Sequence, residues 1–278
     1  SFGDWAALSD TCDEATARII RREVSDGVIA PDYSPEALRI LRAKRDGGYR
    51  VLRIDPDYAP PEVETRQVFG VSLEQRRNAA PIDEGLFANV VTQEKHLPPE
   101  ALRDLIVATV GAKYTQSNTV CLAHNGQLTG VGAGQQSRVH CTRLAATKSD
   151  LWFLRQHPAV LGLAFRPEVR RAERNNAIDL FFLDDLTPPE EESWRACFRQ
   201  VPERLSREER REWLGRVRGV ALSSDAFFPF RDSIDRASRS GVSYIAQPGG
   251  STNDADVIAA CDRYGMTMSI TGLRLFHH

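Results

Sequence analysis

The sequence lacks the features that mark several specialised classes of protein. It has no run of about 18 apolar residues, so no membrane-spanning helix is expected. Its opening residues, SFGDWAALSD, have neither the basic nor the apolar region of a signal peptide. A net charge of -2 gives no broad basic surface for nucleic acid. We therefore expect a cytoplasmic protein that binds neither membranes nor nucleic acid.

Cysteine is scarce and scattered in this chain. The five cysteines are odd in number, and none belongs to a C-x-x-C pair. This pattern argues against a disulfide framework and against a structural zinc site, because such sites usually need closely spaced pairs. It indicates reduced thiols in a reducing compartment.

The chain does have the composition of a globular protein and a repeated alternation of strands and helices. With 278 residues, 41% apolar and 27% charged, it is long enough for two small domains or one large one. Short strands at 28–30 and 49–54 flank a helix that begins with Ser34-Pro35. Three further strands alternate with helices near the end of the chain, at 220–223, 242–246 and 266–270. This order predicts an α/β fold with mostly parallel sheets between layers of helices.

Changes in composition divide the chain into parts. We interpret residues 1–62 as the remainder of a first lobe, residues 63–95 as a connecting arm, and residues 96–278 as a second lobe. Residues 184–219 read as a helical insertion in the second lobe. Two capping-box spacings support that insertion, Thr187 with Glu190 and Ser206 with Glu209.

The stretch from Lys113 to Arg138 contains the strongest local signal. Asn125-Gly126 between two apolar alternations predicts a β-hairpin with a type I′ turn, because that turn needs positive φ at both central residues. Three alternating glycines then leave room for a close approach, Gly130, Gly132 and Gly134. Either a neighbouring backbone or a ligand could fill that room. A helix that starts next to Arg138 would also offer free amides to an anion.

Two loops near the end of the chain are expected to share one edge of the second sheet. The segments 224–231 and 247–253 each follow a strand, and ligands of open α/β sheets collect outside such carboxyl ends. The first loop carries Phe227, Phe228 and Phe230. These side chains are either plain core or a surface for a flat heterocycle, and their place in a loop slightly favours the heterocycle.

Several of these segments resemble one known family. KYTQSN, GAGQQSR, HCTRLA, SSDAFFPFRD and the terminal LRLFHH are similar, in the same order, to the transformylase half of the AICAR transformylase/IMP cyclohydrolase enzymes. The resemblance implies duplicated cytidine-deaminase-like α/β/α lobes, of which the first is incomplete here. It implies transfer of a formyl group from 10-formyltetrahydrofolate to the 5-amino group of AICAR, the aminoimidazole carboxamide ribotide, in purine biosynthesis. It also implies a homodimer with shared active sites.

The resemblance assigns roles to individual residues. Asn118 corresponds to the residue that orients the carboxamide and the reacting amine, and so has the catalytic role. The other residues implied to bind the ribotide are Gly3, Asp26, Arg138, Phe227 and Arg274. Those implied to hold the folate are Val139, Asn176, Asp232, Ser251 and Thr252. The family also has a monovalent cation site, for K+, and the candidates here are Thr115, Ser117, Asp225, Leu275 and His277.

The sequence departs from the family in one respect. The family's general base is a histidine beside a lysine in a K-H-x-S-P-A-G element, and an R-Y-G-x-N-P-H-Q element helps to hold the ribotide. Neither occurs in these 278 residues. Lys95-His96 is no substitute, because it precedes a proline-rich helix entrance where we expect it to be solvated. We expect the missing elements to lie outside this sequence; the alternative is a nucleotide-binding fragment or regulatory module that cannot catalyse alone.

Overall fold

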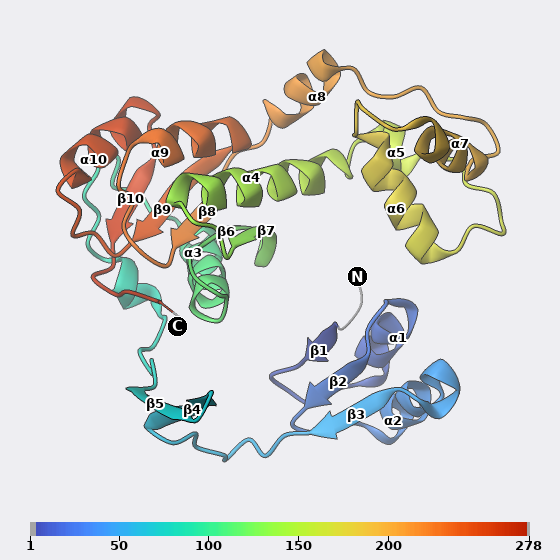
Figure 1. The fold of residues 1–278 in the computed structure, drawn as a ribbon, viewed down its shortest axis with the longest axis horizontal. Coiled ribbons are helices and arrows are strands. Elements are labelled where there is room, and N and C mark those ends of the chain that lie inside the picture. The colour runs from blue at the N-terminus through green and yellow to red at the C-terminus, as the bar shows by residue number, and fades with distance from the viewer. Residues whose placement is uncertain (1–3, 277–278) are drawn as a thin grey trace. The chain divides into compact units, whose positions relative to one another are not determined.

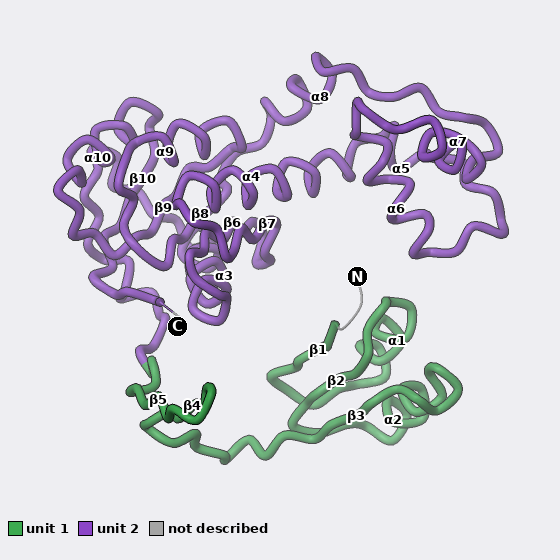
Figure 2. Tube along the Cα trace, in the orientation of Figure 1, with its two compact units in different colours: residues 1–79 green, residues 80–278 purple. Residues whose placement is uncertain are grey.

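The structure is a computed structural model that describes residues 4–276. The chain divides into two compact units, residues 1–79 and residues 80–278 (Figure 2). Each unit has its own hydrophobic core and is described by itself. None of the helices in the described part of the chain is long and apolar enough to cross a bilayer.

The first unit contains a three-stranded parallel sheet in the order β1-β2-β3 (Figure 1). Helices α1 and α2 pack together, and their core joins Ile20 and Leu41 to Val28 of the central strand. The elements of this unit are β1 (Trp5–Ala7), α1 (Glu14–Arg22), β2 (Gly27–Ala30), α2 (Pro35–Arg42), the 3-10 helix η1 (Lys44–Gly47), β3 (Arg50–Arg53), and the antiparallel pair β4 (Val63–Val68) and β5 (Val71–Arg76).

Two side-chain caps start the helices of this unit. The Asp13 carboxylate accepts a hydrogen bond from the Thr16 amide at 2.8 Å, and the Ser34 hydroxyl accepts one from Ala37 at 3.1 Å. Each cap satisfies an amide that has no partner within the first turn of its helix. The start of α2 therefore lies where Ser34-Pro35 predicted it.

The second unit is built on a five-stranded sheet in the order β10-β9-β8-β6-β7. Strands β8, β9 and β10 are parallel, whereas β6 is antiparallel to both β8 and β7. Its elements are η2 (Glu84–Phe87), α3 (Pro99–Lys113), β6 (Thr119–His124), β7 (Gln127–Ala133), α4 (Arg138–Leu154), α5 (Pro158–Leu161), α6 (Arg171–Phe181), α7 (Pro188–Ala196), α8 (Arg207–Leu214), β8 (Val220–Ser224), α9 (Asp232–Ala237), η3 (Ser238–Ser240), β9 (Val242–Gln247), α10 (Asp254–Arg263) and β10 (Thr267–Ile270).

Helices cover both faces of this second sheet. Along β6, Val120 and Leu122 point into a core shared with α4, α9 and α10, while Cys121 and Ala123 point to the opposite face and contact α3 (Figure 1). This alternation is the period of two expected of a strand buried on both sides. The predicted α/β fold with helical layers around the sheet is confirmed.

The hairpin between β6 and β7 forms as predicted. Asn125 and Gly126 have φ of 51° and 76°, the positive values of a type I′ turn. The buried Asp104 of α3 accepts hydrogen bonds from both turn amides, at 2.8 Å from Asn125 and 2.6 Å from Gly126. The turn is thus tied to the helix that precedes the hairpin.

The alternating glycines of β7 serve helix packing. A Cβ atom on Gly130 would lie 2.0 Å from the Ala145 carbonyl oxygen, and one on Gly132 would lie 2.0 Å from that of Cys141. Both acceptor residues belong to α4, so of the two readings of these glycines the neighbouring backbone is correct. Gly134 meets nothing within 4 Å and has a φ of +66°.

Helix α4 joins the sheet to a second, helical core. Cys141 and Ala145 belong to the core of the sheet, whereas Leu154 packs with Phe181 of α6 and Trp194 of α7 (Figure 1). The end of α4 is also tied to α8, because the Trp213 indole donates to the Phe153 carbonyl at 2.9 Å. The segment 184–219 contains α7 and α8.

Candidate functional site

A buried ion pair lies at the centre of the site. Arg138, the first residue of α4, is 7% exposed, and Asp225, which follows β8, is fully buried. The Arg138 guanidinium pairs with the Asp225 carboxylate and donates to the Thr119 carbonyl at 3.0 Å. The same carboxylate accepts from the Thr119 amide at 3.1 Å. Three elements, α4, β6 and the end of β8, are therefore held together by charge-assisted hydrogen bonds.

This pair fixes the side chain of Asn118. Arg138 Nη2 donates to Asn118 Oδ1 at 3.2 Å, and Asn118 Nδ2 donates to the Gln135 carbonyl at 2.9 Å. An amide group has two donor hydrogens and two acceptor lone pairs, so each end of the Asn118 amide retains capacity for a ligand. Asn118 is half-buried. Its amide is oriented before any ligand arrives.

The last described residues of the chain lie next to this ion pair. The Leu275 amide donates to the Asp225 carbonyl oxygen at 2.9 Å, which brings residues 274–276 beside the ion pair. Arg274 is exposed, and its guanidinium carbon lies 4.5 Å from the centre of the Phe276 ring. An exposed arginine that lies over an aromatic ring is suited to an anionic group.

The three phenylalanines of the loop after β8 lie in different environments. Phe228 is fully buried in the core, and its amide donates to Gln247 Oε1 at 2.7 Å. Phe227 and Phe230 are 40% and 60% exposed. One ring therefore belongs to the core, and the other two are accessible to solvent.

The two loops predicted to share an edge are in contact. Asn253 Nδ2 donates to the Pro229 carbonyl at 2.8 Å. The Asp254 carboxylate accepts from the amides of Gly250 and Ser251 at 2.7 and 3.1 Å, which orders the loop before α10. Ser251 and the exposed Thr252 therefore lie on a loop tied to the one that carries Phe227.

The remaining predicted residues are distributed over several segments. Val139 follows Arg138 on α4, and Asp232 begins α9. Asn176 is exposed on α6, in the helical group. The Thr115 hydroxyl donates to the Gly111 carbonyl at 2.6 Å, and Ser117 adjoins Asn118.

Three predicted residues cannot be related to this cluster. Asp26 belongs to the first unit, where it precedes β2 and pairs with Arg45 at 2.5 Å. Gly3 and His277 lie outside the described residues. The structure brings Asn118, Arg138 and Asp225 into contact and places Leu275 against them.

The thiols beside this cluster stay protonated at neutral pH. Burial, helped by the negative charge of Asp225, raises the pKa of Cys121 to about 12. Burial also raises the pKa of Cys141, whose thiol donates to the Asn118 carbonyl at 3.1 Å. Because a thiol must ionise to become a good nucleophile, neither cysteine is suited to covalent catalysis. The cluster can orient and polarise a ligand.

Lys95 and His96 are exposed, and the Lys95 ammonium donates to the Val90 carbonyl at 2.7 Å. The residues that sequence reasoning missed are Thr119 and Gln135, which hold Arg138 and Asn118 through backbone carbonyls. A backbone carbonyl is common to all residues and leaves no signal in the sequence. Asp104 was missed as well, although a single carboxylate on the apolar stripe of α3 could have been noticed.

Comparisons with known proteins agree on one family. A family model described as the AICARFT/IMPCHase bienzyme matches residues 1–148. Two relatives, each described as bifunctional purine biosynthesis protein PurH, come from two strains of Cereibacter sphaeroides. Each is 34% identical to this chain over 279 residues, which covers 100% of this chain and 42% of the relative. The chain thus spans less than half the length of these relatives.

Proposed function

The chain belongs to the AICARFT/IMPCHase bienzyme family, and we propose that it supplies the substrate-orienting part of an AICAR transformylase site. In this proposal the chain binds AICAR and 10-formyltetrahydrofolate in purine biosynthesis. The observation that carries the proposal is the fixed amide of Asn118, which Arg138 holds while Arg138 is itself held by Asp225.

The proposed reaction demands orientation above all. The amine nitrogen of AICAR attacks the formyl carbon and forms a tetrahedral intermediate whose oxygen carries negative charge. The bond from that carbon to N10 of the folate then breaks, the amine loses a proton and N10 gains one. The amine is conjugated with a carboxamide and is a weak nucleophile, so alignment and charge stabilisation supply much of the rate.

The residues of the site are assigned by their geometry. Asn118 would accept from and donate to the carboxamide and amine of AICAR. Arg138 acts through Asn118, because its guanidinium is already engaged by Asp225 and the Thr119 carbonyl. Phe227 offers an aromatic face for the imidazole, and Arg274 offers a charge for the phosphate.

The folate would lie along the two joined loops. Val139, Asp232, Ser251 and Thr252 are its proposed contacts. Asn176 is on the helical group, and it would reach a folate from a second copy of the chain in the proposed homodimer with shared sites.

A monovalent cation is part of the proposal. Asp225 Oδ2 is buried and has no hydrogen-bond partner among the described residues. An orphaned carboxylate oxygen needs a partner, and K+ is held in proteins by oxygen atoms. Hydroxyl and carbonyl oxygens of Thr115, Ser117 and Leu275 would complete such a site. The ion would supply positive charge that fixes the last residues of the chain against Asp225.

Calorimetric titration with AICAR tests the binding step. Asn118→Ala should weaken AICAR binding at least about tenfold, because a buried or half-buried ligand group loses its hydrogen-bond partner. Asn175→Ala, an exposed asparagine on α6, is the matched control and should bind like the wild type. Equal affinity of Asn118→Ala and wild type would remove Asn118 from the site.

A chimera tests the chemical step. The stretch of the Cereibacter sphaeroides relative that matches this chain is replaced by this chain, and formyl transfer is measured with AICAR and 10-formyltetrahydrofolate. We expect turnover in the chimera and its loss with Asn118→Ala. A folded chimera that binds AICAR without turnover would support the alternative of a nucleotide-binding module.

A further inference from the structure

A hollow in the second unit has arginine as its most frequent lining residue. It has a volume of about 880 Å³ and lies between α8, the end of α9 with η3, and the first residues of β9 and β10. Its lining includes six arginines and one carboxylate, Asp150. The arginines are Arg207, Arg210, Arg211, Arg218, Arg236 and Arg239.

This hollow is separate from the Asn118 site. Val242 and Ser243 begin β9, and Met266 immediately precedes β10, so the hollow opens at the amino ends of these parallel strands. Asp225 and the loops around Phe227 follow the carboxyl ends. The two sites therefore lie at opposite edges of one sheet.

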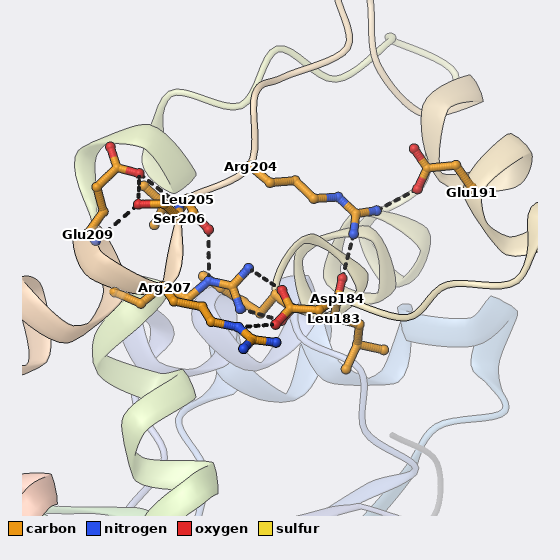
Figure 3. Close-up of polar contacts among 10 residues, drawn as sticks. Leu183, Asp184, Glu191, Arg204, Leu205, Ser206, Arg207 and Glu209 are labelled. Atoms are coloured by element: carbon orange, nitrogen blue, oxygen red, sulfur yellow. Dashed lines mark hydrogen bonds and ion pairs between the residues drawn. The ribbon is translucent and has the colours of Figure 1, made fainter.

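The arginines of α8 and the segment after it follow helical spacing. Arg207, Arg210, Arg211 and Leu214 occupy positions i, i+3, i+4 and i+7, which fall on one side of a helix. Two of the three glutamates of α8 are engaged elsewhere. Glu209 closes the cap with Ser206 (Figure 3). Glu212 pairs with Arg216. Positive charge is thus concentrated on the side that lines the hollow.

Some of this charge is neutralised within the chain. Asp184 pairs with Arg207 at 3.3 Å (Figure 3) and with Arg210 at 3.0 Å. Asp150 pairs with Arg236 at 2.9 Å. These ion pairs hold the guanidinium groups of Arg207, Arg210 and Arg236 in defined positions. Arg236 is held further by the Ser240 hydroxyl at 2.7 Å.

The other three arginines of the hollow are not neutralised by a close carboxylate. Within residues 4–276, Arg211, Arg218 and Arg239 form no ion pair within 4 Å, although Asp235 attracts Arg239 at longer range and Arg218 donates to the carbonyls of Gly215 and Val217. These residues come from two segments that line the hollow: Arg211 and Arg218 from α8 and the residues after it, and Arg239 from η3. Bringing like charges together raises the free energy of the empty protein, and a bound anion removes that cost.

We propose that this hollow binds a small molecule that carries two or more phosphate groups. A guanidinium presents a planar fork of donors that matches two phosphate oxygens, and it remains charged at every accessible pH. Three arginines without a close ion pair, drawn from two segments, suit a chain of phosphates better than a single one. The volume admits a ligand larger than one phosphate ion.

Calorimetric titration of the whole chain with sodium tripolyphosphate tests the proposal. We expect saturable binding that is at least about tenfold tighter than that of inorganic phosphate, and that weakens as salt is added. The double variant Arg211→Gln with Arg239→Gln should weaken tripolyphosphate binding at least about tenfold, since it removes two charge-assisted contacts. Both side chains are exposed, so the variant should melt like the wild type.

A matched control keeps the total charge equal. Arg22→Gln with Arg199→Gln also removes two exposed arginines, from α1 and from the segment after α7, and should bind tripolyphosphate like the wild type. Equal weakening in both double variants would show attraction to net charge alone and overturn the proposal. Loss of binding in Arg274→Gln, with binding intact in Arg211→Gln/Arg239→Gln, would overturn it too, because the anion would then occupy the opposite edge.

Discussion

The two sheets of this chain arise from the same alternation of strands and helices, but they bury their side chains differently. In the first unit, α1 and α2 form one core with β2, and Trp5 and Leu52 on the other face are 44% and 47% exposed. In the second unit, helices cover both faces, and Leu222 and Ile245 are fully buried. Since burial of apolar surface is the main stabilising term, equal secondary structure does not imply equal sensitivity to change.

The two sheets also differ in the atoms that lie closest to their strand glycines. Gly27 of the first sheet lies under the ring of the exposed Trp5, and a Cβ there would be 2.5 Å from a ring atom. Gly132 of the second sheet lies under the backbone of α4. A side chain at a surface can move aside, whereas a helix packed into a core cannot do so cheaply.

Truncating a leucine in each sheet should give the largest difference. Leu222→Ala leaves a cavity between β8 and its covering helices and should lower the free energy of unfolding by about 3 kcal/mol. Leu52→Ala removes a half-exposed side chain and should cost less than about 0.5 kcal/mol. Both losses of free energy can be measured by urea unfolding that is monitored through hydrogen exchange of peptides from each sheet. Similar losses would mean that the outer face of the first sheet is more deeply buried than the exposed fraction of Leu52 indicates.

Replacing one of these glycines by alanine in each sheet should give the next largest difference in stability. Gly132→Ala forces α4 away from β7 and should cost about 2 kcal/mol. Gly27→Ala needs only a rotation of Trp5 and should cost less than about 1 kcal/mol. The tryptophan emission of Gly27→Ala should change while its unfolding midpoint stays close to that of the wild type. A large loss of stability there would show that the Trp5 ring is fixed.

Alkaline pH should affect the second unit more than the first. Burial raises the pKa of Cys121 and Cys261 to about 12, above the ordinary value of 9.0. The stability from keeping each thiol neutral is complete below pH 9 and is lost as pH rises toward 12, with a slope of about 1.4 kcal/mol per pH unit for each thiol. Cys261→Ala should therefore flatten the pH dependence of unfolding in this window.

The matched variant for this pH test is in the first unit. Cys12 is buried, and its pKa is also raised by burial. Cys12→Ala should leave the pH dependence of the second unit unchanged, as followed by exchange of its own peptides. An unchanged slope in Cys261→Ala would contradict the proposed origin of the effect.

Features with local causes were predictable from the sequence. Asn125-Gly126 fixes a turn through the φ values that only a few residues adopt easily, and Ser34-Pro35 fixes a helix start. The alternating glycines were ambiguous for a physical reason. A missing side chain is required equally by a packed helix and by a bound ligand, and only the position of α4 decides between them.

The contacts that build the candidate site could not be predicted from local sequence patterns. Arg138 and Asp225 are 87 residues apart, and nothing in the sequence near either one indicates the other. The resemblance to a family assigned a role to each residue but did not predict that the two form an ion pair. The pairing changes the interpretation of Arg138, because an arginine engaged by a buried carboxylate orients its neighbour more readily than it binds a free phosphate.

Helix caps should give the smallest effects, and they test whether the contrast between the two units extends to local interactions. Ser34→Ala and Ser206→Ala each remove a hydroxyl that accepts from an amide in the first turn, and each should cost about 1 kcal/mol locally. Helix α2 buries Ile40 and Leu41, so its cap should count in the unfolding of the whole first unit. Helix α8 buries none of its described residues, so its cap should change only the exchange of its own amides. A loss of global stability in Ser206→Ala equal to that in Ser34→Ala would show that α8 unfolds together with the sheet, and that cooperativity in the second unit reaches further than its buried core.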